Sequence, residues 1–92
     1  MIDSRIPVII GGDLNTTEFE PLYSSIRQGL VDVHRKAGKG FGFTFPNSRE
    51  WSPWPFMRLD YIMVRGEVEP VHLKVLEESG SDHFGIVAQL KL

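Results

Sequence analysis

Leu59-Asp60-Tyr61-Ile62-Met63-Val64 decides the fold, because it is a short run of apolar and aromatic residues interrupted by one carboxylate. Apolar side chains that point to both sides are typical of a strand with both faces covered. An unpaired carboxylate in such a strand is costly, so Asp60 needs a partner. Two partners are open: a histidine ring, for which His83 is the candidate, or Arg58, two residues away on the same face. A pair with His83 would orient the imidazole and favour its protonated form.

Further strands are expected on either side of this segment. Residues 6–10 are a second apolar, β-branched run and predict a buried strand that ends at Gly11-Gly12. Residues 68–75 predict an extended segment bent at Pro70, and Phe84 to Leu92 a final strand. A brief strand is expected at Phe43-Thr44-Phe45.

One clear helix is expected, with Thr16 or Thr17 as its N-cap and Gly29 as its end. Its inward face is predicted from apolar residues at helical spacing. These are Phe19, Leu22, Tyr23, Ile26 and Leu30. One helix covers only one face of a sheet, whereas several strands are apolar on both faces. We therefore predict an α+β fold, mostly antiparallel or mixed, from which a second layer is missing.

Composition limits the classes of function. The 92 residues allow one small domain, and the net charge of −2 gives no strong global attraction to nucleic acid or anionic membranes. A cluster of Arg35, Lys36 and Lys39 is either a phosphate-binding strip or, more commonly, solvated loop charge. No cysteine is present, which excludes disulfides and thiolate chemistry. No apolar run approaches the ~20 residues of a membrane helix and no signal-peptide layout is present, so a cytoplasmic location is expected.

Two further motifs carry polar residues next to predicted strands. Asp13 and Asn15, in Gly11-Gly12-Asp13-Leu14-Asn15, are two apart and would project together in extended structure. A local turn that satisfies its own backbone is the alternative. Ser81-Asp82-His83 precedes the last strand, and its adjacent Asp and His would point to opposite sides. His34 and His72 do not lie in a motif of this kind and are expected to be surface or packing residues.

These residue types match the needs of phosphoester hydrolysis. The reaction requires an activated water, neutralised charge on the phosphoryl oxygens and help for the leaving oxygen. Carboxylates suit Mg²⁺ or Mn²⁺, and a positioned histidine can act as acid, base or donor to the transition state.

In their order, the three motifs resemble those of the endonuclease/exonuclease/phosphatase family. Gly12-Asp13-Leu14-Asn15 is similar to the family's GD-(L/F)-N, Arg58 to Ile62 to its R-(I/L)-D-Y-(I/V) strand, and Ser81-Asp82-His83 to its terminal SDH. The resemblance covers nearly the whole chain. It implies that residues 1–92 are the C-terminal half of a four-layer α/β/β/α sandwich, whose first half supplies a metal-ligating Glu without counterpart here.

The resemblance also implies roles for single residues. Asp13 would orient the attacking water, Asn15 would steady the phosphoryl group, and Asp60 would orient His83, which contacts the scissile phosphate. Asp82 would lie on the side of the metal, Mg²⁺ or Mn²⁺.

Substrate contacts are less sharply marked. We assign Thr44, Phe45 and Arg58 to substrate binding. Trp51 and Trp54 either form a recognition surface or cover the edge of the core. The partner would be nucleic acid or another phosphoester, and the strand with Arg58 resembles the nuclease branch more than the inositol phosphatases.

Two descriptions of the chain remain open. In the first it is part of a metal-dependent phosphoester hydrolase, of phosphodiesterase or endonuclease type. In the second it is a non-catalytic half-sandwich that forms a homodimer through the uncovered sheet face. We expect the first description to hold for the ancestry of the chain and the second for the behaviour of the isolated chain, which is expected to be inactive.

Overall fold

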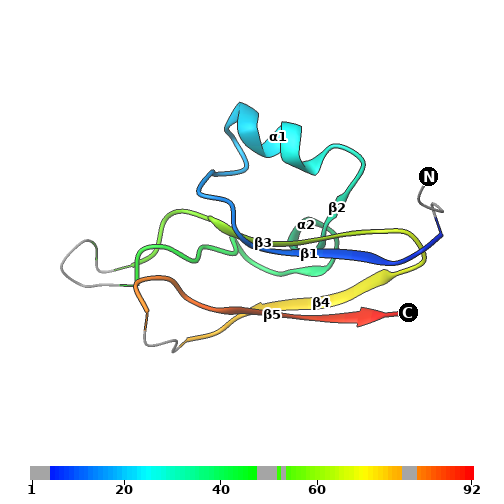
Figure 1. Cartoon of the computed structure of the whole chain (residues 1–92). Helices are drawn as coiled ribbons and strands as arrows, with labels where there is room; N and C mark the ends of the chain where they lie inside the picture. The colour runs from blue at the N-terminus through cyan, green and yellow to red at the C-terminus, as the bar shows by residue number, and fades with distance from the viewer. Residues whose placement is uncertain (1–4, 48–51, 53, 78–80) are drawn as a thin grey trace.

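The computed structural model describes residues 5–47, 52, 54–77 and 81–92. Two short helices and two antiparallel sheets make an α+β fold, as the sequence predicts (Figure 1). The elements in chain order are β1 (Val8–Asp13), α1 (Pro21–Arg27), β2 (Val31–Asp32), α2 (Val33–Ala37), β3 (Asp60–Arg65), β4 (Glu69–Val75) and β5 (Ile86–Lys91). No helix in this part of the chain is long and apolar enough to cross a membrane.

The first sheet has the order β1-β3-β2, with β3, the strand predicted at residues 59–64, in the middle. β1 and β3 pair antiparallel from Val8 opposite Arg65 to Asp13 opposite Asp60. Like charges directly opposite each other in a ladder repel. The register therefore brings two carboxylates together at one end of the sheet, where a positive or proton-donating group is needed.

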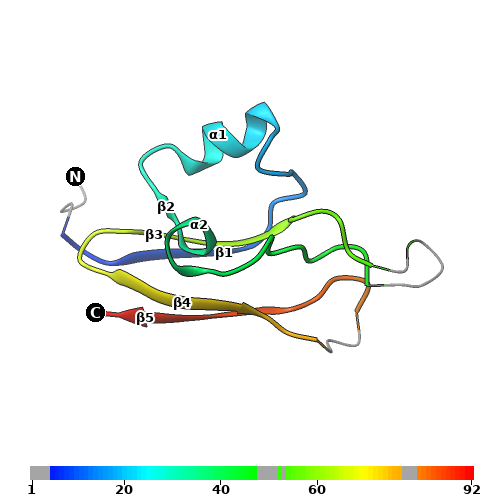
Figure 2. The ribbon, with the colours of Figure 1, turned by 180° about the vertical axis from the view of Figure 1, so that it is seen from behind.

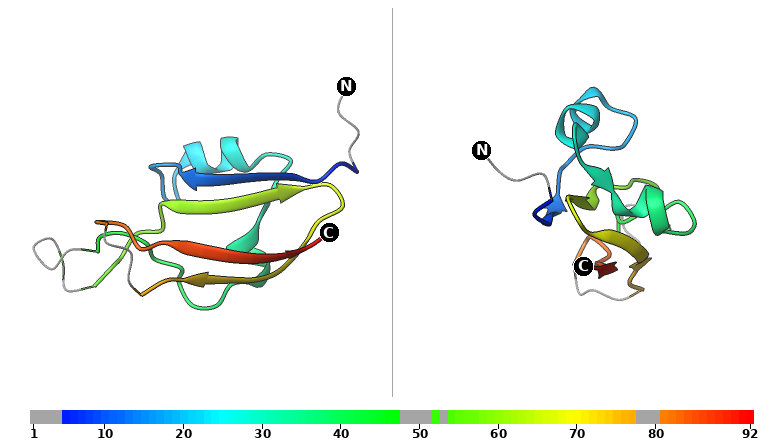
Figure 3. Two further views of the ribbon diagram at one scale, coloured as in Figure 1. Left: turned by 60° about the horizontal axis from the view of Figure 1, so that its bottom comes forward. Right: turned by 90° about the vertical axis from the view of Figure 1, so that its right-hand side faces the viewer.

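The second sheet is the hairpin of β4 and β5, which has a register irregularity between Pro70 and His72. Figures 1 and 3 show this hairpin on the side of β1 and β3 away from α1, with β5 running beside β3. The predicted extended segment at 68–75 and the predicted last strand are both present, and the bend predicted at Pro70 corresponds to the irregularity.

Two small clusters form the core. Tyr23 of α1 packs on Tyr61 and Met63 of β3, with Leu14, Ile26 and Leu30 around them. Val33 of α2 packs with Val64 of β3 and Leu73 of β4. Figure 2 shows α2 in front of β3 and above β4. Because successive side chains of a strand alternate, Tyr61 and Met63 face one cluster while Val64 faces the other. β3 is thus covered on both faces, as its sequence predicts.

β1 is a strand, but the prediction that it is buried is wrong. Ile9 is 54% and Ile10 41% exposed. β1 is an edge strand of this sheet, and no described element covers these side chains. Their exposure agrees with the inference that a second layer is missing from the chain.

The helix also differs from its prediction. It begins at Pro21 rather than after Thr16 or Thr17, and Glu20 is its N-cap in an extended conformation. Proline is favoured at the first helical position and keeps the preceding residue extended, so Pro21 sets the start. Phe19 is consequently 89% exposed instead of packing inward, and Leu22 is 53% exposed.

The strand predicted at residues 43–45 is reduced to an isolated bridge between Phe45 and Met57. The ambiguous stretch after residue 30 becomes β2 followed by α2, in which the Asp32 side chain accepts from the His34 backbone N–H.

Candidate active site

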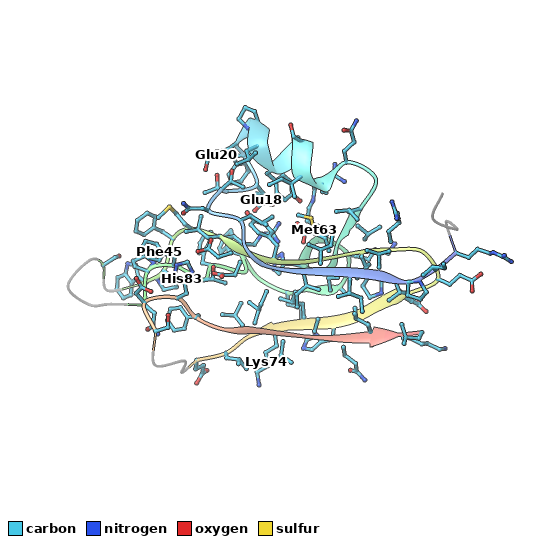
Figure 4. The ribbon with its side chains drawn as sticks, in the orientation of Figure 1. Glu18, Glu20, Phe45, Met63, Lys74 and His83 are labelled. Atoms are coloured by element: carbon cyan, nitrogen blue, oxygen red, sulfur yellow. The ribbon has the colours of Figure 1, made fainter. Side chains whose placement is uncertain are left out.

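A histidine and two carboxylates meet at the end of β1 and β3. His83 Nδ1 lies 2.7 Å from Asp60 Oδ2, and His83 Nε2 lies 3.6 Å from Asp13 Oδ2. The hypothesis that Asp60 pairs with His83, and not with Arg58, is confirmed. Figure 4 shows His83 beside Phe45 at the end of the two sheets.

The local backbone explains why Asp13 reaches this point. β1 ends at Asp13, opposite Asp60, and the Leu14 N–H still donates to the Leu59 carbonyl at 3.0 Å. Asn15 then turns away with φ of 53°, a conformation that asparagine tolerates. Its backbone N–H donates to Asp13 Oδ1 at 2.8 Å, which leaves the other oxygen, Oδ2, directed at His83.

The environment of His83 favours its protonated form. The hydrogen bond to Asp60 raises the pKa of His83, and the negative charges of Asp60, Asp13 and Asp82 act in the same direction against partial burial. The Phe45 ring lies 4.9 Å from the imidazole, centre to centre, and forms one wall of the site. The imidazole ring is therefore fixed in place, although the His83 side chain is 22% exposed to solvent.

A second loop holds the Ser81–His83 turn. The Asn47 N–H donates to the Asp82 carbonyl at 2.6 Å, and Asn47 Nδ2 donates to the Ser81 carbonyl at 2.9 Å. The Ser81 hydroxyl accepts the N–H of His83 at 3.2 Å. Asn47 was not among the predicted site residues. The turn signal Pro46-Asn47 was visible in the sequence, but its contact with a segment 34 residues away was not.

Thr44 connects this loop to β3. Its hydroxyl lies 3.2 Å from the backbone nitrogen of Leu59 and 3.3 Å from that of Asp60, and its carbonyl accepts from the Phe84 N–H at 2.7 Å. Thr44 is fully buried, so it contacts the residues that flank Asp60 and His83 instead of presenting its hydroxyl to solvent. Phe45, by contrast, lies against the histidine ring.

Arg58 does not join the cluster. Its guanidinium is buried and binds Asp32, with Nη1 3.0 Å from Asp32 Oδ1, and contacts Glu18 at 3.3 Å. The Tyr23 hydroxyl donates to Asp32 Oδ2 at 2.6 Å. Burial alone would raise the pKa of Asp32, but the hydrogen bonds from Arg58 and Tyr23 outweigh it and lower the pKa. Asp32, like Asp60, is a carboxylate between apolar residues, but the sequence around it predicted neither a clear strand nor a clear helix, so its burial was not predicted.

The Asp82 side chain is exposed, and its Oδ1 lies 3.3 Å from the Ser81 hydroxyl. Among the described residues, the three whose ligand atoms lie within 4.8 Å of one another are Asp13, Asp60 and His83. Asp82 contributes its backbone carbonyl to the loop contact. Trp54 is 71% exposed, whereas Trp51 lies outside the described residues.

The other two histidines are where they were expected. His72 is exposed on β4, and the ring of His34 fits closely against Gly38 and Gly42.

Comparison with known proteins assigns the chain to a family. A model of the Endonuclease/Exonuclease/phosphatase family matches residues 1–83. The chain belongs to this family, whose members are hydrolases of phosphoester type, and the proposed resemblance is confirmed. No curated protein sequence matches the chain closely enough to count as a relative.

Solved structures share the fold. A mannosyl-6-phosphatase of Bacteroides thetaiotaomicron superposes with a TM-score of 0.79 at 23% identity, over 95% of this chain and 38% of that one. A family protein of Leptotrichia buccalis is 30% identical with a TM-score of 0.74, over 99% of this chain and 37% of that one. The chain therefore spans little more than a third of the length of these proteins.

Proposed function

We propose that the chain carries part of the catalytic site of a metal-dependent phosphoester hydrolase, of phosphodiesterase or endonuclease type. The observation that carries this proposal is the imidazole of His83 held between two carboxylates, Asp60 on one nitrogen and Asp13 on the other. A ring fixed in this way is suited to donate a proton or a hydrogen bond in one direction.

His83 would act on the phosphoryl group. Asp60 accepts from Nδ1, so Nε2, which faces Asp13, is the nitrogen that would act on the substrate. With its pKa raised, the imidazole is protonated over a wider range of pH and can donate from Nε2 to a phosphoryl oxygen. This donation stabilises the charge that develops in the transition state.

Asp13 would orient the attacking water. Its side chain is 44% exposed, and one oxygen is held by the N–H of Asn15. The other oxygen can accept from a water close to Nε2 of His83. In the proposal the side-chain amide of Asn15 donates to the same phosphoryl group.

The donor set accommodates Mg²⁺ or Mn²⁺ in part. Asp13 and Asp60 supply hard carboxylate oxygens, but Asp60 Oδ2 is already bound to the imidazole. Asp13 is therefore the stronger candidate ligand, with Asp82 beside the site, and the remaining ligands would come from outside this chain. A divalent ion would neutralise charge on the phosphoryl oxygens.

The direct test is hydrolysis of bis(p-nitrophenyl) phosphate with Mg²⁺ by the 92-residue chain. His83→Ala should lower the rate by about 10²–10⁴-fold. Gln89→Ala changes an exposed residue of β5 and should leave the rate unchanged. A Mg²⁺-dependent rate that is equal in wild type and His83→Ala contradicts the proposed role of His83. No Mg²⁺-dependent rate at all shows that the 92 residues do not form a working site by themselves, and the same pair of variants is then compared in a longer protein that supplies the remaining ligands.

A second candidate is a non-catalytic half-sandwich that forms a homodimer. It is favoured by the exposure of Ile9 and Ile10 on an edge strand, because such a strand is a template for pairing with another chain. Sedimentation should then show a dimer that Ile10→Lys converts to a monomer. A monomeric wild-type chain contradicts this second candidate.

A further inference from the structure

A groove lies between residues 38–43 and β4. It has a volume of about 410 Å³. Lys39, His72 and Lys74 line it together with Phe41 and Phe43, and no carboxylate is among the described residues that line it. Figure 4 shows Lys74 pointing away from the hairpin. Three basic side chains without an acidic one are a local exception in a chain with a net charge of −2.

Phe41 is presented to solvent by a defined backbone. Its ring stacks on Phe43 with centres 5.1 Å apart and planes at 6°, yet Phe41 is 76% exposed. Gly40 and Gly42, on either side of it, have φ of 70° and 72°, which side chains rarely adopt. A Cβ on Gly42 would also meet the His34 ring at 2.6 Å. The loop is therefore built to hold one free aromatic face outward.

The same loop is fixed against β4. The Gly38 N–H donates to the His34 carbonyl at 2.8 Å, and Gly38 forms a parallel bridge with Leu73. Lys39 follows this bridge directly, while His72 and Lys74 flank Leu73 on the strand. The bridge thus gathers the basic side chains beside the stacked rings.

An exposed aromatic ring beside basic side chains is suited to single-stranded nucleic acid. Proteins bind single-stranded nucleic acid by stacking bases on aromatic rings in a groove whose cations follow the phosphates. A free Phe41 face offers the stacking surface, and Lys39 and Lys74 offer the phosphate contacts. The segment is also continuous with the catalytic wall, because Phe45, two residues after Phe43, contacts His83.

We propose that this groove binds single-stranded nucleic acid, with a base stacked on Phe41 and adjacent phosphates on Lys39 and Lys74. The bound nucleic-acid strand would continue past Phe45 toward His83. This part of the proposal rests on the proposed hydrolase function and makes nucleic acid the substrate class of that hydrolase. Binding itself needs no catalysis. It can therefore be measured in EDTA, where a failure of binding and a failure of hydrolysis are seen separately.

The first arm tests stacking. The probe is a fluorescein-labelled 12-nucleotide deoxythymidine oligomer, compared by fluorescence anisotropy with a fully abasic oligomer of equal length. Phe41→Leu should weaken binding of the thymidine oligomer about tenfold and leave the abasic oligomer unchanged. The matched control is Phe19→Leu, which alters an equally exposed phenylalanine next to α1 and should change neither affinity.

The second arm tests phosphate contact. Replacing Lys39 and Lys74 by Gln should weaken both oligomers and reduce the slope of log affinity against log salt by about 0.7 per lysine removed. Lys91→Gln, an exposed lysine at the end of β5, should leave the slope unchanged. The proposal is overturned if Phe41→Leu and Phe19→Leu behave alike, if the slope is insensitive to Lys39 and Lys74, or if the wild-type chain binds neither oligomer.

Discussion

Two charged pairs begin two residues apart in the sequence, at Arg58 just before β3 and at Asp60, its first residue, and they differ in exposure. Arg58 binds Asp32 with side chains 2% and 1% exposed, whereas Asp60 binds His83 with side chains 18% and 22% exposed. In the first pair, Asp32 also accepts a hydrogen bond from the hydroxyl of Tyr23, which belongs to α1. In the second pair, the other ring nitrogen of His83 faces the exposed carboxylate of Asp13.

The difference separates stability from chemistry. Arg58 and Asp32 are charged throughout the ordinary pH range, because their contacts raise the pKa of Arg58 and lower that of Asp32 against the effect of burial. His83 can gain or lose a proton near neutral pH and remains accessible. One R-x-D motif therefore supplies both a structural charge and a reactive one.

The largest expected effect is on the buried pair. Arg58→Leu leaves the Asp32 carboxylate buried without its cation and should reduce the free energy of unfolding by about 3–5 kcal/mol. Urea denaturation followed by circular dichroism measures the loss. A reduction below about 1 kcal/mol would show that the pair does not stabilise the fold in the way its burial indicates.

A double variant makes the interpretation specific. Replacing both Arg58 and Asp32 by leucine removes the orphaned charge, so it should recover part of the stability lost in Arg58→Leu. If the double variant is less stable than Arg58→Leu, the N-cap that Asp32 provides to α2 matters more than the ion pair.

An intermediate effect is expected where the two regions meet. Thr44→Val removes the hydroxyl that accepts from the N–H groups of Leu59 and Asp60, and should cost about 1–3 kcal/mol of stability. Because the Thr44 hydroxyl contacts the backbone of Asp60 itself, we expect the NMR signals of Asp60 and of its partner His83 to shift. Thr44→Ser keeps the hydroxyl and should retain the wild-type chemical shifts; equal shifts in both variants would exclude a role for the hydrogen bonds.

The sequence was sufficient to predict the strand β3 and to name His83 as one of two candidate partners for Asp60, and the reason is physical. A carboxylate within an apolar strand must find a partner, and that requirement can be stated without coordinates. The same requirement holds for Asp32, but the short stretch around it gave no clear strand or helix, so its burial could not be foreseen. Arg58 was then assigned to substrate because its true partner was unknown.

Long-range contacts were harder to foresee than local ones. The start of α1 at Pro21 followed a local rule that was visible but was outweighed by the cap signals at Thr16 and Thr17. By contrast, the contacts of Thr44 with β3 and of Asn47 with the Ser81 turn depend on tertiary structure. The burial of Thr44 was therefore beyond any periodicity in the sequence.

A smaller effect concerns the proton on His83. The hydrogen bond that His83 Nδ1 donates to Asp60 is the main cause of the raised pKa of His83, so Asp60→Asn should move the NMR titration midpoint of His83 downward. Gln89→Ala, which changes an exposed residue of β5, is the control variant and should leave the His83 midpoint unchanged. An unchanged His83 midpoint in Asp60→Asn would mean that Asp60 does not control its protonation.

The smallest effect is the contribution of this pair to stability, and its sign follows from the same shift. Because the folded pKa of His83 lies above the unfolded value of about 6.5, the pair stabilises the fold fully below that pH. The contribution is lost as the pH rises through the folded pKa. The stability difference between wild type and Asp60→Asn should therefore be largest near pH 6 and decrease toward pH 9, by no more than about 1 kcal/mol for a partly exposed pair. Gln89→Ala should show no such trend relative to wild type. A difference between wild type and Asp60→Asn that grows with pH would contradict the assigned direction of the shift. A small change in the free energy of unfolding for Asp60→Asn, together with a large one for Arg58→Leu, would confirm that the stabilising charge of Arg58 and the carboxylate of Asp60 that orients His83 lie in two separate environments.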